Sequence, residues 1–505
     1  MDGQGRIAAL GGIGARPVAS GGVPGMTSAA PGGDQGATGA PPDPLALLRS
    51  RSYIQLLVLA AVIGVPVSAL AYGFLKLVAV LQTWFFGTLP KELGFHGVPA
   101  WWPLPLLAVA GLLVSSVIRY LPGRGGHSPA DGFHAGGTPD PIDLPGVLLA
   151  ALATLSLGVV LGPEAPLIAM GGGLGVLAVH LAKRDAPPTA ATVMAAAGSF
   201  AAISTLFGSP IAGAFLLMEA AGLGGPMLGL VLVPGLLAAG VGTLVFVGLD
   251  SLTGFGTFSL AIPGLPPFQH PTGAMFLWAL AFGLVASVAG TGIRLLALAV
   301  RPLVERRMIL LTPLVGLAVA GLAIGFAEAT GRSSSTVLFS GQSALPGLVQ
   351  NAAGWTVGAL LLLIVCKSLA YGISLSSFRG GPVFPSLFIG AAGGIAASHL
   401  PGLSLVPGLA MGIGAMCTVM LKLPLTSTLL ATLLLYSDGL AVMPLVIVAV
   451  VVAYAATAWM PQTVAELRGR TAVEADEADT GTGPAQAPAV AAADTGNPTG
   501  SAADG

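Results

Sequence analysis

The chain has 505 residues with a formal net charge of -1, and 54% of them are hydrophobic while only 8% are charged. Because a soluble domain carries about 25% charged residues, this composition excludes an ordinary soluble protein and indicates an all-α polytopic membrane protein embedded in the lipid bilayer. The sequence has no basic face for nucleic acid, and its two cysteines provide no disulfide framework.

Residues 1–50 are rich in Gly, Pro, Ala and Ser and contain no apolar core segment. We therefore expect a disordered cytosolic arm and no cleaved signal. The membrane domain then falls into two halves. Apolar runs in the first half, residues 51–250, predict helices over 53–89, 103–120, 143–161, 164–181, 189–206, 210–222 and 226–247. A polar connection follows over residues 251–270.

The second half, residues 271–462, predicts helices over 272–300, 309–328, 352–375, 382–399, 405–421, 424–437 and 440–459. Residues 463–505 are mostly Ala, Asp, Glu, Gly and Thr, so we expect a disordered cytosolic tail.

Arginines flank the long apolar segments in three groups, which the positive-inside rule assigns to the cytosol. The groups are Arg49 and Arg51; Arg301, Arg306 and Arg307; and Arg468 and Arg470. The first long helix of half one therefore starts inside, whereas the first long helix of half two ends inside. This arrangement is typical of an inverted repeat in a multi-pass protein of the cell membrane, with both termini cytosolic.

Glu164 is the only formally charged residue in the apolar run from Pro145 to Leu181. A carboxylate at membrane depth costs about 2.5–3.5 kcal/mol, which favours a functional role. Gly162 and Pro163 interrupt the preceding segment, and Pro163 suits the first turn of a new helix. Helix N-termini carry partial positive charge and unpaired N–H groups that bind anions. We predict a broken membrane helix with an acid at its tip. A structural acid hydrogen-bonded to that helix end is the alternative.

The same Gly-Pro pattern recurs in the second half. Residues 162–166, followed by Gly171 and Gly175, align with residues 381–385, followed by Gly390 and Gly394, at a constant offset of 219 residues. A second pair, Ser209-Pro210 and Leu423-Pro424, agrees at an offset of 214. In an inverted repeat the two broken half-helices would meet with their N-termini at one point near the membrane midplane, where we expect the anion.

These motifs resemble those of the CLC family of chloride channels and proton/chloride antiporters, over about residues 53–460. The family's G-[KR]-E-G-P motif has its counterpart at residues 162–166, its G-x-F-x-P motif at 381–385 and its G-S-G-I-P motif at 125–129. The resemblance implies the CLC fold in a prokaryotic-type member without a soluble regulatory domain. It also implies passive transport of chloride or a similar anion and a homodimer, with protons as a further candidate partner.

In the family the glutamate of the first motif is the gate, so the resemblance gives this role to Glu164. An ionised carboxylate can lie in the anion site and compete with chloride, and a protonated one can swing away. The other expected anion-binding residues lie at the two helix tips and in the first loop: Gly162, Ala165, Pro166, Gly381, Val383, Phe384, Pro385, Gly125, Gly126, His127 and Ser128. No catalytic residue, metal or cofactor is expected.

The sequence departs from the family pattern at both tips and in the loop. Pro163 and Pro382 lack the N–H that the family usually keeps, which leaves the donors of Glu164, Ala165, Val383 and Phe384. Gly126 occupies the slot of the family's anion-binding serine, so His127 or Ser128 would have to substitute. A loop histidine bonded to backbone and a helix N-cap before Pro129 are the respective alternatives.

The family's central tyrosine has no secure match near the last membrane helix. Thr463 falls near that slot, and Tyr454 lies about two turns earlier, where it also suits an interfacial anchor. The cytosol-side glutamate of the exchangers corresponds to Ala220. Its neighbour Glu219 points about 100° away on a helix, so we expect a structural acid there and keep a proton role as an alternative.

We therefore predict an uncoupled chloride channel or transporter gated by Glu164. The alternative within transport is a proton-coupled antiporter of chloride, another halide or nitrate. A multi-pass membrane enzyme with Glu164 as general acid or base is the rival class. The sequence contains no His-x-x-x-His, Glu-x-x-His or Cys pair that would support catalysis.

Overall fold

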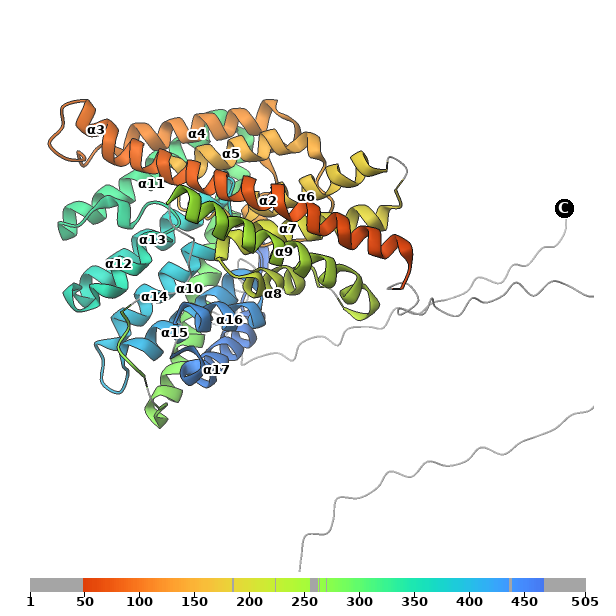
Figure 1. The fold of residues 1–505 in the computed structure, drawn as a ribbon. Helices are drawn as coiled ribbons and strands as arrows, with labels where there is room; N and C mark the ends of the chain where they lie inside the picture. The colour runs from red at the N-terminus through yellow and green to blue at the C-terminus, as the bar shows by residue number, and fades with distance from the viewer. Residues whose placement is uncertain are drawn as a thin grey trace, which may run out of the picture. The chain divides into compact units, whose positions relative to one another are not determined.

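The computed structural model describes residues 49–466 except 184–185, 223, 255–261, 263, 269 and 436–437, and only the backbone at 225–227. Within this part of the chain the regular structure is helical, without strands (Figure 1). The first half contains α2 (Arg51–Thr83), α3 (Leu89–Glu92), α4 (Pro103–Tyr120), α5 (Leu144–Ser156), α6 (Glu164–Ala182), α7 (Pro188–Phe207), α8 (Pro210–Ala220) and α9 (Gly225–Thr253).

The second half contains α10 (Gly273–Arg306), α11 (Met308–Thr330), α12 (Leu345–Gln350), α13 (Val357–Ser377), α14 (Val383–Ser398), α15 (Leu405–Leu421), α16 (Pro424–Leu434) and α17 (Gly439–Ala458). In the described part of the chain, 9 helices are long and apolar enough to cross a membrane. Several others, including α14 and α16, are shorter apolar helices. The predicted all-α polytopic membrane fold is confirmed.

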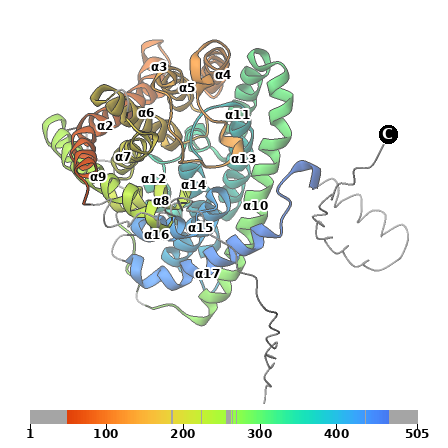
Figure 2. The same ribbon diagram turned by 90° about the vertical axis from the view of Figure 1, so that its right-hand side faces the viewer.

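Helix packing follows the same order in both halves. The first helix of each half packs against the last, α2 against α9 and α10 against α17. Between them α6, α7 and α8 pack in sequence, as α14, α15 and α16 do. The halves also contact each other, for example α4 against α11 and α8 against α16 (Figures 1 and 2). This repeated order is the one that the duplicated motifs predicted.

Glycines hold the corresponding helix pairs close together. A Cβ added to Gly171 of α6 would lie 2.6 Å from the carbonyl carbon of Gly198 in α7. A Cβ added to Gly390 of α14 would lie 2.7 Å from the carbonyl carbon of Gly412 in α15. Any larger residue would force these backbones apart, as expected where membrane helices pack through small residues. Gly171 and Gly390 are the residues that the 219-residue offset aligned.

Some helix bounds differ from those that the sequence predicted. α9 continues to Thr253 and α10 to Arg306, beyond the predicted ends at 247 and 300. Polar side chains end the apolar pattern there, but a helix that leaves the hydrocarbon can continue in polar sequence. α5 instead ends at Ser156 rather than 161, and Gly158 follows with a φ of 102°, which favours glycine. The short helix α12 carries no span-length apolar run and was not predicted.

Candidate functional site

The N-termini of α6 and α14 meet through a short antiparallel backbone contact. Gly162 N–H donates to the carbonyl of Gly381 at 2.8 Å, and Gly381 N–H donates to the carbonyl of Gly162 at 2.6 Å. Pro163 and Pro382 follow as the N-cap residues, and the helices begin at Glu164 and Val383. The two Gly-Pro segments therefore fix the relative position of two helix tips that lie 219 residues apart in sequence.

The Glu164 carboxylate lies between the two tips and is fully buried. Its Oε1 accepts a hydrogen bond from Phe384 N–H at 2.9 Å, so the acid of the first half caps the helix of the second half. Oε2 is buried and has no hydrogen-bond partner in the described part of the chain. A charge at this point is stabilised by the partial positive charge of the α14 N-terminus.

Close approach of backbone to the carboxylate requires glycine at both tips. A Cβ on Gly162 would lie 2.6 Å from Cδ of Glu164, and a Cβ on Gly381 would lie 2.8 Å from the same atom. Real Cβ contacts essentially never fall below 3.0 Å. Since the N–H of each glycine donates to the carbonyl of the other, neither N–H is free to donate to an ion. The anion-binding role expected for Gly162 and Gly381 stays a prediction.

Three buried polar residues near the tip of α14 were not predicted. The Tyr371 hydroxyl donates to the carbonyl of Pro382 at 3.0 Å. Ser386 donates to the carbonyl of Val383 at 2.7 Å and lies 3.4 Å from Sγ of Cys417. Their place in apolar helices α13, α14 and α15 hid them, because periodicity does not distinguish a site-facing residue from a core residue. They hold the first turn of α14 in position.

The remaining tip residues surround the carboxylate without adding side-chain donors. Ala165 and Pro166 form the first turn of α6, and Pro385 lies in the first turn of α14. Pro166 and Pro385 carry no N–H and contribute shape only. The ring of Phe384 lies 5.9 Å from that of Phe207 at the end of α7, so an aromatic pair closes one side.

The loop with Gly125, Gly126, His127 and Ser128 lies next to the segment that leads into α14. A Cβ on Gly125 would lie 3.4 Å from Cγ of Arg379. The His127 ring stacks on that of His134 at 6.2 Å between centroids. Ser128 precedes a short 3-10 turn but makes no capping hydrogen bond. None of the four donates to Glu164 through a side chain.

Two separate cavities each reach one of the two N-cap prolines. One, of about 290 Å³, is lined by Pro163, by Gln82 of α2 and by polar residues before α12, including Ser340 and Gln342. The other is narrow and is lined by Pro382, by Pro129 and Ala130 of the loop, and by Arg294 and Ala297 of α10. The Glu164 carboxylate lies between these prolines.

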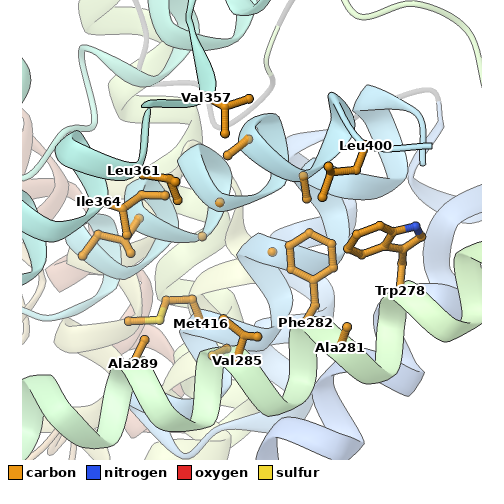
Figure 3. Close-up of a pocket in the computed structure, with 17 residues that line it drawn as sticks. Trp278, Ala281, Phe282, Val285, Ala289, Val357, Leu361, Ile364, Leu400 and Met416 are labelled. Atoms are coloured by element: carbon orange, nitrogen blue, oxygen red, sulfur yellow. The ribbon is translucent and has the colours of Figure 1, made fainter. Parts of the chain in front are cut away.

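A third pocket, between α10, α13, α14 and α15, is unsuited to an anion. Its volume is about 380 Å³, and its walls are apolar residues such as Phe282, Leu361 and Met416 (Figure 3). The Trp278 indole at its rim donates to the carbonyl of Pro401. No charged side chain lines this pocket, so an anion would gain nothing there.

The three accessory candidates lie away from Glu164. Glu219 caps α16: its carboxylate accepts from Leu425 N–H at 2.9 Å and from both the N–H and hydroxyl of Thr426 at 2.7 Å. Tyr454 is 50% exposed on α17. The Thr463 hydroxyl accepts from Glu466 N–H at 3.1 Å, which is a local cap. Within the part of the chain that the structure describes, none of their side-chain hydrogen bonds reaches the tip of α6 or α14.

Comparison with known proteins identifies the family. The family model described as voltage gated chloride channel matches residues 106–458. The chain belongs to this family. Relatives in Salmonella paratyphi A and Salmonella typhimurium, each named "Putative ion-transport protein YfeO", are 32% identical over 358 residues, covering 69% of this chain and 81% of each relative.

Solved structures agree on the fold of this CLC family member. A slow cyanobacterial Cl⁻/H⁺ antiporter superposes with a TM-score of 0.64 at 22% identity, covering 79% of this chain and 94% of its own. A CLC-type fluoride/proton antiporter gives 0.63 at 20% identity, covering 81% and 96%. The protein is thus a multi-pass membrane protein of an anion-transport family, which is a family of transporters and channels rather than enzymes.

Proposed function

We propose that this CLC family member is a chloride channel or uncoupled chloride transporter in which the Glu164 carboxylate gates the anion site. The observation that carries the proposal is the buried carboxylate itself, bonded to Phe384 N–H at 2.9 Å between two converging helix tips. A carboxylate in that position occupies the place that a permeating anion needs. Gating is then the replacement of the Glu164 carboxylate in the site by an anion from solution.

Backbone donors of the two first turns form the proposed anion site. Once Glu164 moves away, the N–H of Phe384 is released, and those of Val383, Glu164 and Ala165 belong to the same two helix starts. Since partial charges hold an ion without trapping it, such a site permits passage. The cavity of about 290 Å³ at Pro163 is the proposed approach from one end of the site.

The bonding of Glu219 favours uncoupled transport. All three of its hydrogen bonds go to the N-terminus of α16, and Ala220 stands where the exchangers of the family carry their inner glutamate. A carboxylate engaged with three donors is poorly suited to take up and release a proton in each cycle. Proton-coupled exchange is the second candidate function, because the two structurally similar proteins are described as proton antiporters.

Flux measurements in liposomes test both the gate and the coupling. Chloride efflux and proton movement are recorded together under an imposed chloride gradient. We expect chloride efflux without stoichiometric proton movement. Efflux should rise as pH falls, because protonation removes the charge with which Glu164 competes for the site. Pumping of protons by the chloride gradient at a fixed ratio would establish the antiporter instead.

A neutral variant isolates the gate. Glu164→Gln should conduct at all pH values with a flat pH profile, since its side chain cannot compete as an anion. Glu328→Gln, which neutralises an exposed acid at the end of α11, is the matched control and should keep the pH dependence of the wild type. A Glu164→Gln profile that still follows that of the wild type would contradict gating by this residue.

Assembly and topology stay predictions. We expect a homodimer with both termini in the cytosol, which cross-linking in membranes and protease accessibility from each side can test. Most of the predicted arm, residues 1–48, and of the predicted tail, residues 467–505, lies outside the described residues. The boundaries of the two repeats are proposed from the order of helix packing described above.

A further inference from the structure

The apolar pocket between α10, α13, α14 and α15 opens toward the lipid bilayer (Figure 3). Two of the residues that line it are strongly exposed, Val285 of α10 at 67% and Leu361 of α13 at 54%. Both helices are long and apolar enough to cross a membrane. The opening between them therefore faces hydrocarbon and not water.

Small residues of α14 create the hollow. Gly393, Ala396 and Ala397 line the pocket, and a Cβ added to Gly393 would meet nothing within 4 Å. The pocket has a volume of about 380 Å³. An apolar cavity offers water no hydrogen-bond partners and takes up apolar molecules instead. In a bilayer the apolar molecules at hand are lipid chains.

The length of the pocket matches one leaflet of the membrane. The lining residues of α10 run from Trp278 to Ala289, which are 11 positions apart. At 1.5 Å per residue this distance is about 16 Å. One leaflet contributes about 15 Å of hydrocarbon, half of a core that is roughly 30 Å thick. A single acyl chain that lies along α10 would therefore fill the pocket from the interface toward the midplane.

The Trp278 end of the pocket is the interfacial end. Trp278 lies five positions after Gly273, where α10 begins, and Val357 is the first residue of α13. The indole N–H of Trp278 donates to the carbonyl of Pro401 at 3.4 Å. Such a side chain, apolar in its body and polar at its tip, suits the boundary between hydrocarbon and water. A lipid whose chain fills the pocket therefore has its headgroup near these helix ends.

A cation lies beside this end. The guanidinium of Arg332 stacks on the ring of Trp355 at 3.6 Å from its centroid and donates to the carbonyl of Gly354. Trp355 precedes Val357 of the pocket by two residues, which span at most about 7 Å. Among the described residues, no carboxylate forms an ion pair with Arg332. Because a guanidinium has five N–H donors in a fork that fits phosphate, Arg332 can also bind a lipid phosphate.

We propose that this pocket binds one phospholipid from the leaflet in which α10 begins. One acyl chain lies along α10 against Gly393 and Ala396, and the anionic headgroup is held by Arg332 beside Trp355. The terminal segments 1–48 and 467–505 are poor rivals, because neither contains a long apolar run and both are predicted on the side where α10 ends. The inference goes beyond the proposed function, since none of the pocket residues belongs to the proposed anion site.

Retention of lipid through purification tests the site. The protein is reconstituted in liposomes of equal phosphatidylglycerol and phosphatidylcholine, extracted into detergent and weighed by native mass spectrometry. We expect one retained phosphatidylglycerol per chain. Gly393→Phe should lose it, because the ring fills the hollow, and Ala397→Leu repeats this test with a smaller side chain. Gly321→Phe is the matched control, since Gly321 is an exposed glycine of α11 with nothing within 4 Å, and it should retain the lipid.

The headgroup contact has its own variants. Arg332→Gln should lower the ratio of retained phosphatidylglycerol to phosphatidylcholine about fivefold, because it removes one positive charge at the membrane surface. Arg332→Lys should keep most of the preference. Lys91→Gln, at an exposed lysine of α3, removes a charge elsewhere and should leave the ratio unchanged.

A photoreactive acyl chain distinguishes the pocket from the general lipid surface. Met416 of α15 lines the pocket but is only 2% exposed, so a lipid that merely surrounds the protein does not reach it. Phosphatidylglycerol with a diazirine near the end of its chain should label Met416 in the wild type and in Gly321→Phe, but not in Gly393→Phe.

Three results would overturn the proposal. The first is a wild-type protein that retains no phospholipid or is not labelled at Met416. The second is an equal loss of lipid in folded Gly393→Phe and Gly321→Phe proteins, which would reveal a general effect of added bulk. The third is cross-linking of two copies through Val285→Cys without label at Met416, which would assign the pocket to a second copy of the chain. Chloride flux tests the gate separately, and its failure would leave the lipid site intact.

Discussion

Gly381→Ala adds one methyl group at the point where the two helix tips cross. Gly381 is not among the residues with positive φ, so alanine suits its backbone and only the new contact matters. The added Cβ would lie 2.8 Å from Cδ and 2.9 Å from Cβ of Glu164, and would overlap its Oε2. Either the carboxylate leaves the tip or the contact between Gly162 and Gly381 opens.

Moving the side chain is the smaller change, because it sacrifices one hydrogen bond instead of two. A hydrogen bond to a charged group contributes about 1.5–3 kcal/mol, which corresponds to roughly a 10- to 150-fold change in the ratio of bound to displaced carboxylate. We therefore expect Gly381→Ala to conduct chloride at neutral pH and to lose most of its pH dependence, as Glu164→Gln does.

The assay is chloride efflux from liposomes at several pH values, with Gly393→Ala as control. Gly393 lies in α14, the helix that begins two residues after Gly381, and a Cβ there meets nothing within 4 Å, so that variant should match the wild type. A folded Gly381→Ala protein with the efflux and pH profile of the wild type would refute the reasoning. If Gly381→Ala instead misfolds, adding Glu164→Gly should restore folding, because it removes every contacting side-chain atom.

Two further predictions concern stability, measured as thermal unfolding in detergent. Lys367→Met should lower the free energy of unfolding by about 3–5 kcal/mol. The buried ammonium donates to the four backbone carbonyls of residues 336–339 at 2.9–3.2 Å, and methionine cannot replace these hydrogen bonds. Lys91→Met, at an exposed lysine, should leave the unfolding temperature almost unchanged. Glu219→Ala should lower the free energy of unfolding by about 2 kcal/mol, because α16 loses its N-terminal cap. Glu328→Gln should leave the stability unchanged. Unfolding temperatures equal to that of the wild type would show that these contacts do not stabilise the fold.

The membrane class, the breaks in the helices and the duplication could be read from the sequence. α15 was predicted at its observed bounds, and α6 and α14 within one residue at each end. These features are local: a proline removes an N–H wherever it stands, and apolar runs leave water in any fold. The charge of Glu164 in its apolar run was likewise visible, and so was its position at a helix tip.

The partner of each polar group could not be read in this way. Lys367 lies in an apolar helix, and only the structure shows that it is fully buried on backbone carbonyls from the segment before α12. Tyr371 and Ser386 looked like ordinary members of apolar helices. Such contacts depend on which face of a helix meets which distant segment, and hydropathy alone carries no signal for that choice.

The sequence by itself determined that this protein crosses the membrane many times and that two Gly-Pro breaks leave helix N-termini inside it. Only the tertiary structure decided that Gly162 and Gly381 bond to each other, that Glu164 caps Phe384, and that Arg332 stacks on Trp355. The physical reason is range. Proline breaks and apolar runs depend only on residues that are neighbours in the sequence. A donor and an acceptor that lie 219 or 220 positions apart, by contrast, meet only after the two halves have packed.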